Sequence, residues 1–121
     1  MKAVVKGILL VLLCGLSQPV LAQKGLGEKA TDLNNQAVEE ARQDRYAEAL
    51  KLVNAALEID PEEEVFLVNK TTILNRLGRE EEALKVLDKA LAQAPHSPHL
   101  RRARGGLLLE MADQPRDIEN F

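Results

Sequence analysis

Small and apolar residues recur along most of this chain at the spacing of amphipathic helices. Residues 45–61 have the sequence RYAEALKLVNAALEIDP, and 34 residues later the chain continues REEEALKVLDKALAQAP. In the first copy Ala49 and Ala56 lie seven residues apart and so share one helical face, beside Val53. Because small side chains let two helices approach closely, the pattern predicts antiparallel helix pairs repeated every 34 residues.

The ends of the predicted helices carry residues that start or stop a helix. Pro61 and Pro95 have no amide proton and end the second helix of each copy. Gly78 is typical of a left-handed helix C-terminus, and Asp44 takes the same place in the first copy. Asp60 is expected to cap the next helix, with Pro61 at its first position. The predicted helices cover residues 28–43, 46–60, 65–77, 79–93 and 99–112.

This pattern resembles the tetratricopeptide repeat, a helix–turn–helix unit of the same length. The matching positions are the small residue at position eight, the alanines at twenty and twenty-seven and the proline at thirty-two: Ala37, Thr71, Ala49, Ala56, Ala83, Ala90, Pro61 and Pro95. The family's large aromatic residue at position four is replaced by Leu33 and Leu67, which are also apolar and keep a core side chain there.

The resemblance implies an all-α fold, a short right-handed α-solenoid of antiparallel helix pairs. The expected segments are a flexible lead-in over residues 23–29, repeats over 30–63 and 64–97, a degenerate third unit or capping helix over 98–114 and a tail over 115–121. Because a solenoid unit buries its apolar face only on its neighbours, this short array is marginal. The last helix, a second copy or a partner is expected to cover an open end.

The first 22 residues have the three parts of a secretory signal peptide. Lys2 and Lys6 give a positive start, an apolar run follows, and Val20 and Ala22 supply the small residues of a cleavage site. The apolar run is shorter than the ~20 residues that a spanning helix needs, which makes an uncleaved anchor the weaker alternative. We expect cleavage after Ala22, secretion to the bacterial periplasm and no membrane span in the mature chain.

Cys14, the only cysteine, lies inside this apolar run. It is either an ordinary apolar residue of the signal core or a lipidation site, but Leu13 before it is larger than the residue a bacterial lipobox places there. If Cys14 is removed with the signal peptide, the mature chain has no disulfide, thiol nucleophile or thiolate metal site.

The charge balance excludes one class of partner. Without Lys2 and Lys6, 14 basic and 19 acidic residues remain, a net charge of −5. Nucleic-acid binding needs clustered positive charge, and Tyr46, Phe66 and Phe121 are too few for a base-stacking surface. We therefore expect no nucleic-acid partner.

No set of residues predicts catalysis, a metal site or a cofactor. His96 and His99 lie three residues apart without an evident third ligand, and two histidines at a helix start are usual surface residues. Ser97 has neighbours that do not form a catalytic array, because such arrays are assembled across a fold. The sequence also has no glycine-rich phosphate loop. We expect a protein that is not an enzyme and needs no cofactor.

The first helices of the repeat units carry polar residues in register. Asn35 and Asn69 share position six, and Arg42 and Arg76 share position thirteen. In the family these positions lie on or beside the concave surface, where an asparagine can donate to and accept from a peptide backbone. Repeat inheritance without a ligand explains the register equally. The predicted partner-binding residues are Asn35, Arg42, Asn69, Thr72, Arg76 and Arg102.

Arg102 belongs to a basic cluster with Arg101 and Arg104. Arginine binds carboxylates through two parallel hydrogen bonds, so the cluster is either a clamp for an acidic peptide or a solvated face. In family members that clamp a peptide's terminal carboxylate, the five polar positions would correspond here to Asn34, Val38, Asn69, His99 and Ala103. Only Asn69 matches, so that specificity is not carried over.

Together these features predict a small secreted helical-repeat protein that binds another protein or peptide in the concave groove of its repeats, as a scaffold or adaptor in the cell envelope. The alternative is a structural protein that assembles with itself through the exposed ends of a short solenoid. The first function yields a complex with a different protein, and the second yields a homo-oligomer.

Overall fold

The computed structural model describes residues 25–114, which form five α-helices and, within that range, no β-strand. A first helix over residues 25–42 is followed by α2 (Tyr46–Ile59), α3 (Glu64–Arg76), α4 (Glu80–Gln93) and α5 (Pro98–Asp113). All five predicted helices are present. The predicted signal peptide (residues 1–22), Cys14 within it and the predicted tail (115–121) lie outside the described residues.

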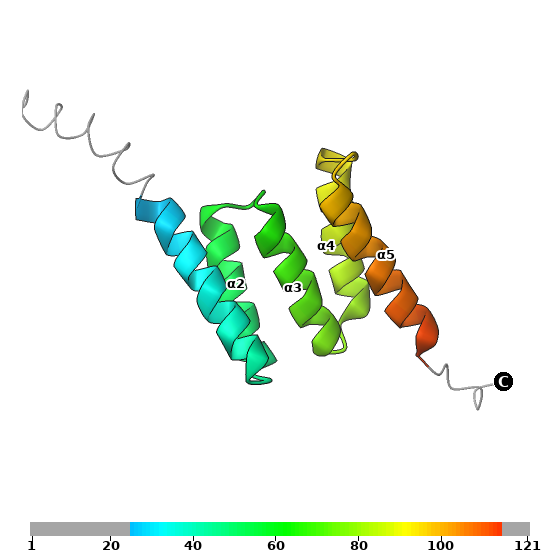
Figure 1. The fold of residues 1–121 in the computed structure, drawn as a ribbon, viewed down its shortest axis with the longest axis horizontal. Helices are drawn as coiled ribbons and strands as arrows, with labels where there is room; N and C mark the ends of the chain where they lie inside the picture. Colours follow the sequence, from blue (N-terminus) through cyan, green and yellow to red (C-terminus); the bar gives the residue numbers. More distant parts are fainter. Residues whose placement is uncertain (1–24, 115–121) are drawn as a thin grey trace, which may run out of the picture.

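The helices form a row of antiparallel neighbours, with the first helix (cyan) at one end and α5 (orange) at the other (Figure 1). The first helix, α3 and α5 lie in one layer, and α2 and α4 lie in a second layer behind it. Consecutive helices from α2 to α5 pack together, and α3 also contacts α5. The predicted all-α solenoid of helix pairs is therefore confirmed.

The core repeats with the same period as the sequence. Matching buried residues line α2 and α4: Ala49, Val53 and Ala56 in the first, and Ala83, Leu87 and Ala90 in the second. Phe66 and Ile73 of α3 pack into the first cluster, and Leu100 and Leu107 of α5 pack into the second. Each front-layer helix after the first thus buries two large side chains against the back-layer helix that precedes it.

The turns within the two units have the same backbone construction. Asp44 and Gly78 have φ angles of 60° and 77°, so the predicted left-handed conformation is confirmed at both places. The N–H of the next residue then donates to a carbonyl of the preceding helix, at 2.9 Å in both turns: Arg45 to Glu40, and Arg79 to Leu74. This geometry returns each second helix antiparallel to the first.

Two helix starts differ from the prediction. The first helix already includes residue 25, the first described residue, so residues 25–29 of the segment expected to be a flexible lead-in (23–29) are helical. The predicted range of α3 (65–77) lies within one residue of the observed helix, but the predicted cap at Asp60, with Pro61 at the first helical position, is wrong. Asp60 ends α2, with its backbone N–H donating to the Ala56 carbonyl at 3.0 Å. Glu63 caps α3 instead, accepting from a backbone N–H two residues later at 3.4 Å.

Candidate functional site

The front layer of helices contains two adjoining hollows. One, of about 270 Å³, lies between the first helix and α3, and the other, of about 160 Å³, lies between α3 and α5. Thr72 and Arg76 of α3 line both hollows. The two hollows therefore lie side by side across three helices, with Thr72 and Arg76 at their common border. We call this surface the interhelical groove.

The first hollow combines apolar and polar side chains. It is lined by Val38, Ala41, Arg42, Tyr46, Asn69, Thr72, Ile73 and Arg76. The Tyr46 hydroxyl donates to the Asp44 carboxylate at 2.9 Å. This hydrogen bond and partial burial raise the pKa of Tyr46, while the positive charge of Arg76 opposes the shift. The phenol therefore stays neutral at physiological pH and adds apolar surface to the hollow.

Arg42 and Arg76 occupy equivalent places on the two helices that border the first hollow. Both side chains are exposed. Within residues 25–114 neither takes part in an ion pair; the four pairs found there use Arg45, Lys51, Arg79 and Arg104. Both guanidinium groups are consequently available to a ligand, with five N–H donors each.

One hydrogen bond joins the first helix to α3 beside the first hollow. The side-chain amide of Asn69 on α3 donates to the side-chain oxygen of Asn34 on the first helix at 2.9 Å. Asn34 is only 6% exposed, so the bond satisfies a buried acceptor. Asn69 thus has a structural role in addition to lining the groove. The sequence analysis missed Asn34 as a partner of Asn69.

The second hollow has a different charge at the equivalent position. Its lining residues are Val68, Thr71, Thr72, Asn75, Arg76, Ala103, Gly106, Leu107 and Glu110. Glu110 follows Arg76 by one repeat period, as Arg76 follows Arg42. The Asn75 side chain donates to the Glu110 carboxylate across the hollow. Along position thirteen of the three units, the groove therefore carries two positive charges and then a negative one.

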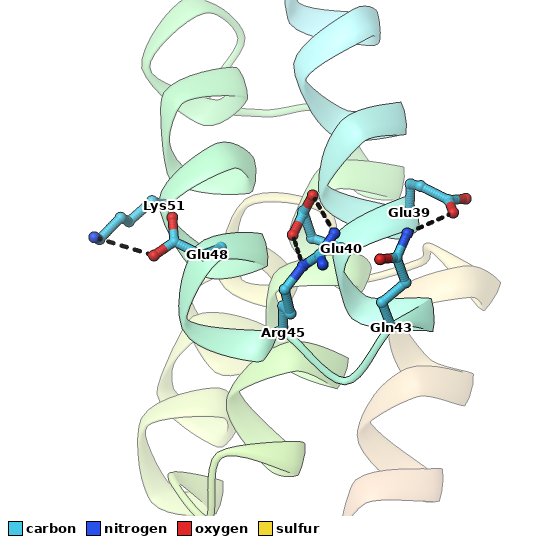
Figure 2. Close-up of polar contacts among 6 residues, drawn as sticks. All are labelled: Glu39, Glu40, Gln43, Arg45, Glu48 and Lys51. Carbon is cyan, nitrogen blue, oxygen red and sulfur yellow. Dashed lines mark hydrogen bonds and ion pairs between the residues drawn. The ribbon is translucent and has the colours of Figure 1, made fainter.

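The turn beside the first hollow is held by a contact between side chains. Arg45 extends back across the turn to Glu40, as Figure 2 shows, and makes two hydrogen bonds to its carboxylate. This interaction lowers the pKa of Glu40 below its ordinary value. Figure 2 also shows two other contacts, between Glu39 and Gln43 and between Glu48 and Lys51. The Glu40–Arg45 contact links the C-terminal end of the first helix to the start of α2.

The family of this chain follows from a comparison with protein-family models. The tetratricopeptide-repeat model matches residues 40–107, from the end of the first helix into α5. The match covers more than half of the sequence. The chain belongs to the tetratricopeptide-repeat family. No curated protein matches the chain.

Tetratricopeptide repeats form a non-catalytic family whose members generally mediate protein–protein interaction. A protein partner is thus the ligand that this family suggests. Within residues 25–114, no group of three potential His, Cys, Asp or Glu ligands lies together. In the same part of the chain, no helix is both long and apolar enough to cross a membrane.

The structure brings together four of the six partner-binding residues predicted for this tetratricopeptide-repeat protein. Arg42, Asn69, Thr72 and Arg76 all line the interhelical groove. The other two, Asn35 and Arg102, are exposed and line neither hollow. The groove also contains polar residues that the sequence analysis did not select, Asn75 and Glu110. The signal for Glu110 was the same repeat period, followed into the third unit. The period gave no signal for Asn75, because Ala41 and Leu109 occupy its place in the other units.

The basic cluster near the end of the chain is divided by the fold. Arg101 and Arg104 line a separate hollow between α4 and α5, and Arg102 does not line it. Arg104 pairs with Asp88 of α4 at 2.7 Å. Arg104 therefore joins two helices, and the three arginines do not converge on one site.

Proposed function

We propose that this tetratricopeptide-repeat protein holds a segment of a partner protein in the interhelical groove, as a scaffold or adaptor. The observation that carries the proposal is that two hollows adjoin on one face and share Thr72 and Arg76 at their border. Four of the predicted partner-binding side chains line these hollows. Together they supply apolar contact area and hydrogen-bonding groups on adjacent helices.

The dimensions of the groove fit an extended segment better than a small molecule. Packed helices lie about 8–10 Å apart, so a path over three of them is roughly 20 Å long. An extended chain rises about 3.3 Å per residue, so about six residues cover that path. The exposed side chains of Val38 and Thr72 along the way can contact successive partner residues.

We also propose that the partner is met in the cell envelope. Residues 1–22 have the positive start, apolar run and small-residue cleavage site of a secretory signal peptide. Cell fractionation followed by N-terminal sequencing tests this location. A periplasmic protein that starts at Gln23 is the expected result, and a cytoplasmic protein that retains Met1 would contradict it.

The groove is tested by photocrosslinking inside cells. A photoreactive residue replaces Thr72, which is exposed and lines both hollows. The control replaces Glu58, an exposed residue of α2 outside both hollows. We expect one discrete adduct with a different protein from position 72 and none from position 58. Equal labelling from both positions, or none from 72, would rule out the groove as the binding site.

A further inference from the structure

Two arginines in the groove have no structural role in the described part of the chain. Arg42 and Arg76 border the first hollow from neighbouring helices, both are exposed, and neither forms an ion pair within residues 25–114. Of the arginines that pair, Arg45 and Arg104 each join two helices, and Arg79 pairs with Glu82 at the start of its own helix, α4. The pair at 42 and 76 therefore places two unmatched positive charges at one hollow.

The surroundings of these two arginines favour binding of an anion. Apolar side chains of Val38, Ala41 and Ile73 line the same hollow. Such a surface partly excludes water, so water competes less well with the arginines for a charged ligand. This strengthens a contact between a carboxylate and a guanidinium group. Overall the chain is acidic, with 19 acidic and 16 basic residues, so the positive charge here is a local feature.

We infer that the partner segment carries an acidic side chain that binds Arg42 and Arg76, next to an apolar side chain that covers Val38 and Ile73. This inference rests on the proposed function and names the chemistry of the partner. The groove continues past Arg76 into the second hollow. A bound segment therefore runs on beyond the two arginines, which favours a side-chain carboxylate over the end of a chain.

The opposite end of the groove gives the segment a direction. Glu110 lines the second hollow and has no cationic partner within residues 25–114. A partner carboxylate is attracted at the first hollow and repelled at the second. The acidic residue consequently lies over the first helix and α3, and the remainder of the segment extends toward α5.

Peptide selection tests the inference. It uses the protein in the form in which it is isolated from cells. Random peptides displayed within a longer chain, with no free C-terminus, are selected on the wild type. Each enriched peptide is then synthesised with its acidic residue intact and with the matching amide, Asp to Asn or Glu to Gln. Binding is measured by fluorescence anisotropy at low and high salt.

The same peptides are measured on two variants with equal loss of charge. Arg42→Gln with Arg76→Gln removes the pair at the hollow. Lys51→Gln with Lys89→Gln removes two exposed lysines from α2 and α4, neither of which lines the groove. Thermal unfolding of all proteins verifies that these exposed substitutions leave the fold intact.

On the wild type and the lysine control, we expect the acidic peptide to bind at least about tenfold more tightly than its amide, because the amide lacks the charge-assisted hydrogen bond to the arginines. High salt should reduce that difference. On the arginine variant both peptides should bind equally. If enriched peptides bind but the amide exchange has no effect on the wild type, the acidic anchor is wrong while groove binding stands. If no peptide is enriched, groove binding itself fails.

Discussion

The contact between Glu40 and Arg45 shows how one pair of side chains shifts the pKa of a carboxyl group. Arg45 donates two hydrogen bonds to the Glu40 carboxylate across the turn between the first helix and α2. The charged form of Glu40 is favoured, so its pKa in the folded protein lies below its ordinary value. The stabilisation from this contact is complete above the ordinary pKa. It is lost as the pH falls through the lower pKa of the folded state.

We expect an NMR titration of the side-chain carboxyl carbons to show Glu40 titrating below the ordinary value of a glutamate. Arg45→Gln should return the pKa of Glu40 to that ordinary value, because the hydrogen bonds and the positive charge are removed together. Lys51→Gln is the matched control, since Lys51 pairs with Glu48 and not with Glu40. An unchanged Glu40 pKa in the Arg45 variant would contradict this cause.

The asparagines mark how far repeat register predicts a site. The 34-residue period correctly placed Asn69 in the groove, because equivalent residues of stacked helices lie on one surface. It also selected Asn35, which is exposed outside both hollows, while its neighbour Asn34 is buried and bonded to Asn69. One residue along a helix is a rotation of about 100°. The sequence has asparagine at both positions, so residue type alone could not separate them.

At the scale of the elements, α5 is weakened by two glycines in its interior. Gly105 and Gly106 lie within its 16 residues, where glycine disfavours the helix. Gly105 is exposed, and a Cβ added there would meet no atom within 4 Å. Ser97 compensates at the helix start, because its hydroxyl accepts from the Leu100 N–H at 3.2 Å.

Gly105→Ala should therefore stabilise the protein by about 0.5–1 kcal/mol, through lower backbone entropy of the unfolded chain. Urea unfolding followed by circular dichroism measures the change. Gly78→Ala is the opposite control, because a φ of 77° strains any residue with a Cβ. It should destabilise by about 1 kcal/mol. A Gly105 variant less stable than the wild type would show that α5 has neighbours at this position beyond those described.

Helix boundaries were the least predictable feature of the elements. The periodic apolar pattern located all five helices, since burial on one face is a property of the whole segment. The cap of α3 was misplaced because Asp60 and Pro61 are compatible with both a helix end and a helix start. The structure uses Asp60 at the end of α2 and leaves the cap of α3 to Glu63. Only the path of the chain between the two helices decides between these uses.

At the scale of the molecule, the two ends of the solenoid differ from its interior in a regular way. Phe66 and Ile73 of α3 are buried against the preceding helix. One period earlier, the first helix has Asp32 and Glu39 at these positions, and both are exposed. The described residues contain no helix before the first one, so polar residues occupy the face that would otherwise be apolar. This is the construction of a capping repeat.

The other end combines charged and apolar residues. The equivalents of Leu67, Thr71 and Leu74 in α5 are Arg101, Gly105 and Leu108. Leu74 is fully buried against α4, whereas Leu108 is 38% exposed because α5 has no second helix beside it within the described residues. Arg101 replaces an apolar residue at the same face. Two charged arginines, Arg101 and Arg104, therefore border the place where another helix pair would stack.

These charged ends predict a monomer. Two copies joined through like ends would bury Asp32 and Glu39, or Arg101, against like charges, which is unfavourable. Joined head to tail, they would pair Arg101 with an acidic residue, but the cost of removing both charges from water offsets that attraction. Sedimentation velocity over a wide range of concentrations should give one species of constant monomer mass. Asp32→Leu with Glu39→Leu restores the interior pattern of Phe66 and Ile73 at the exposed end. That variant should associate as its concentration rises, because it exposes an apolar helix face. Concentration-dependent association of the wild type would instead favour self-assembly as the function. If Thr72→Arg then abolished this association, the contact between the two copies would lie in the groove rather than at the ends.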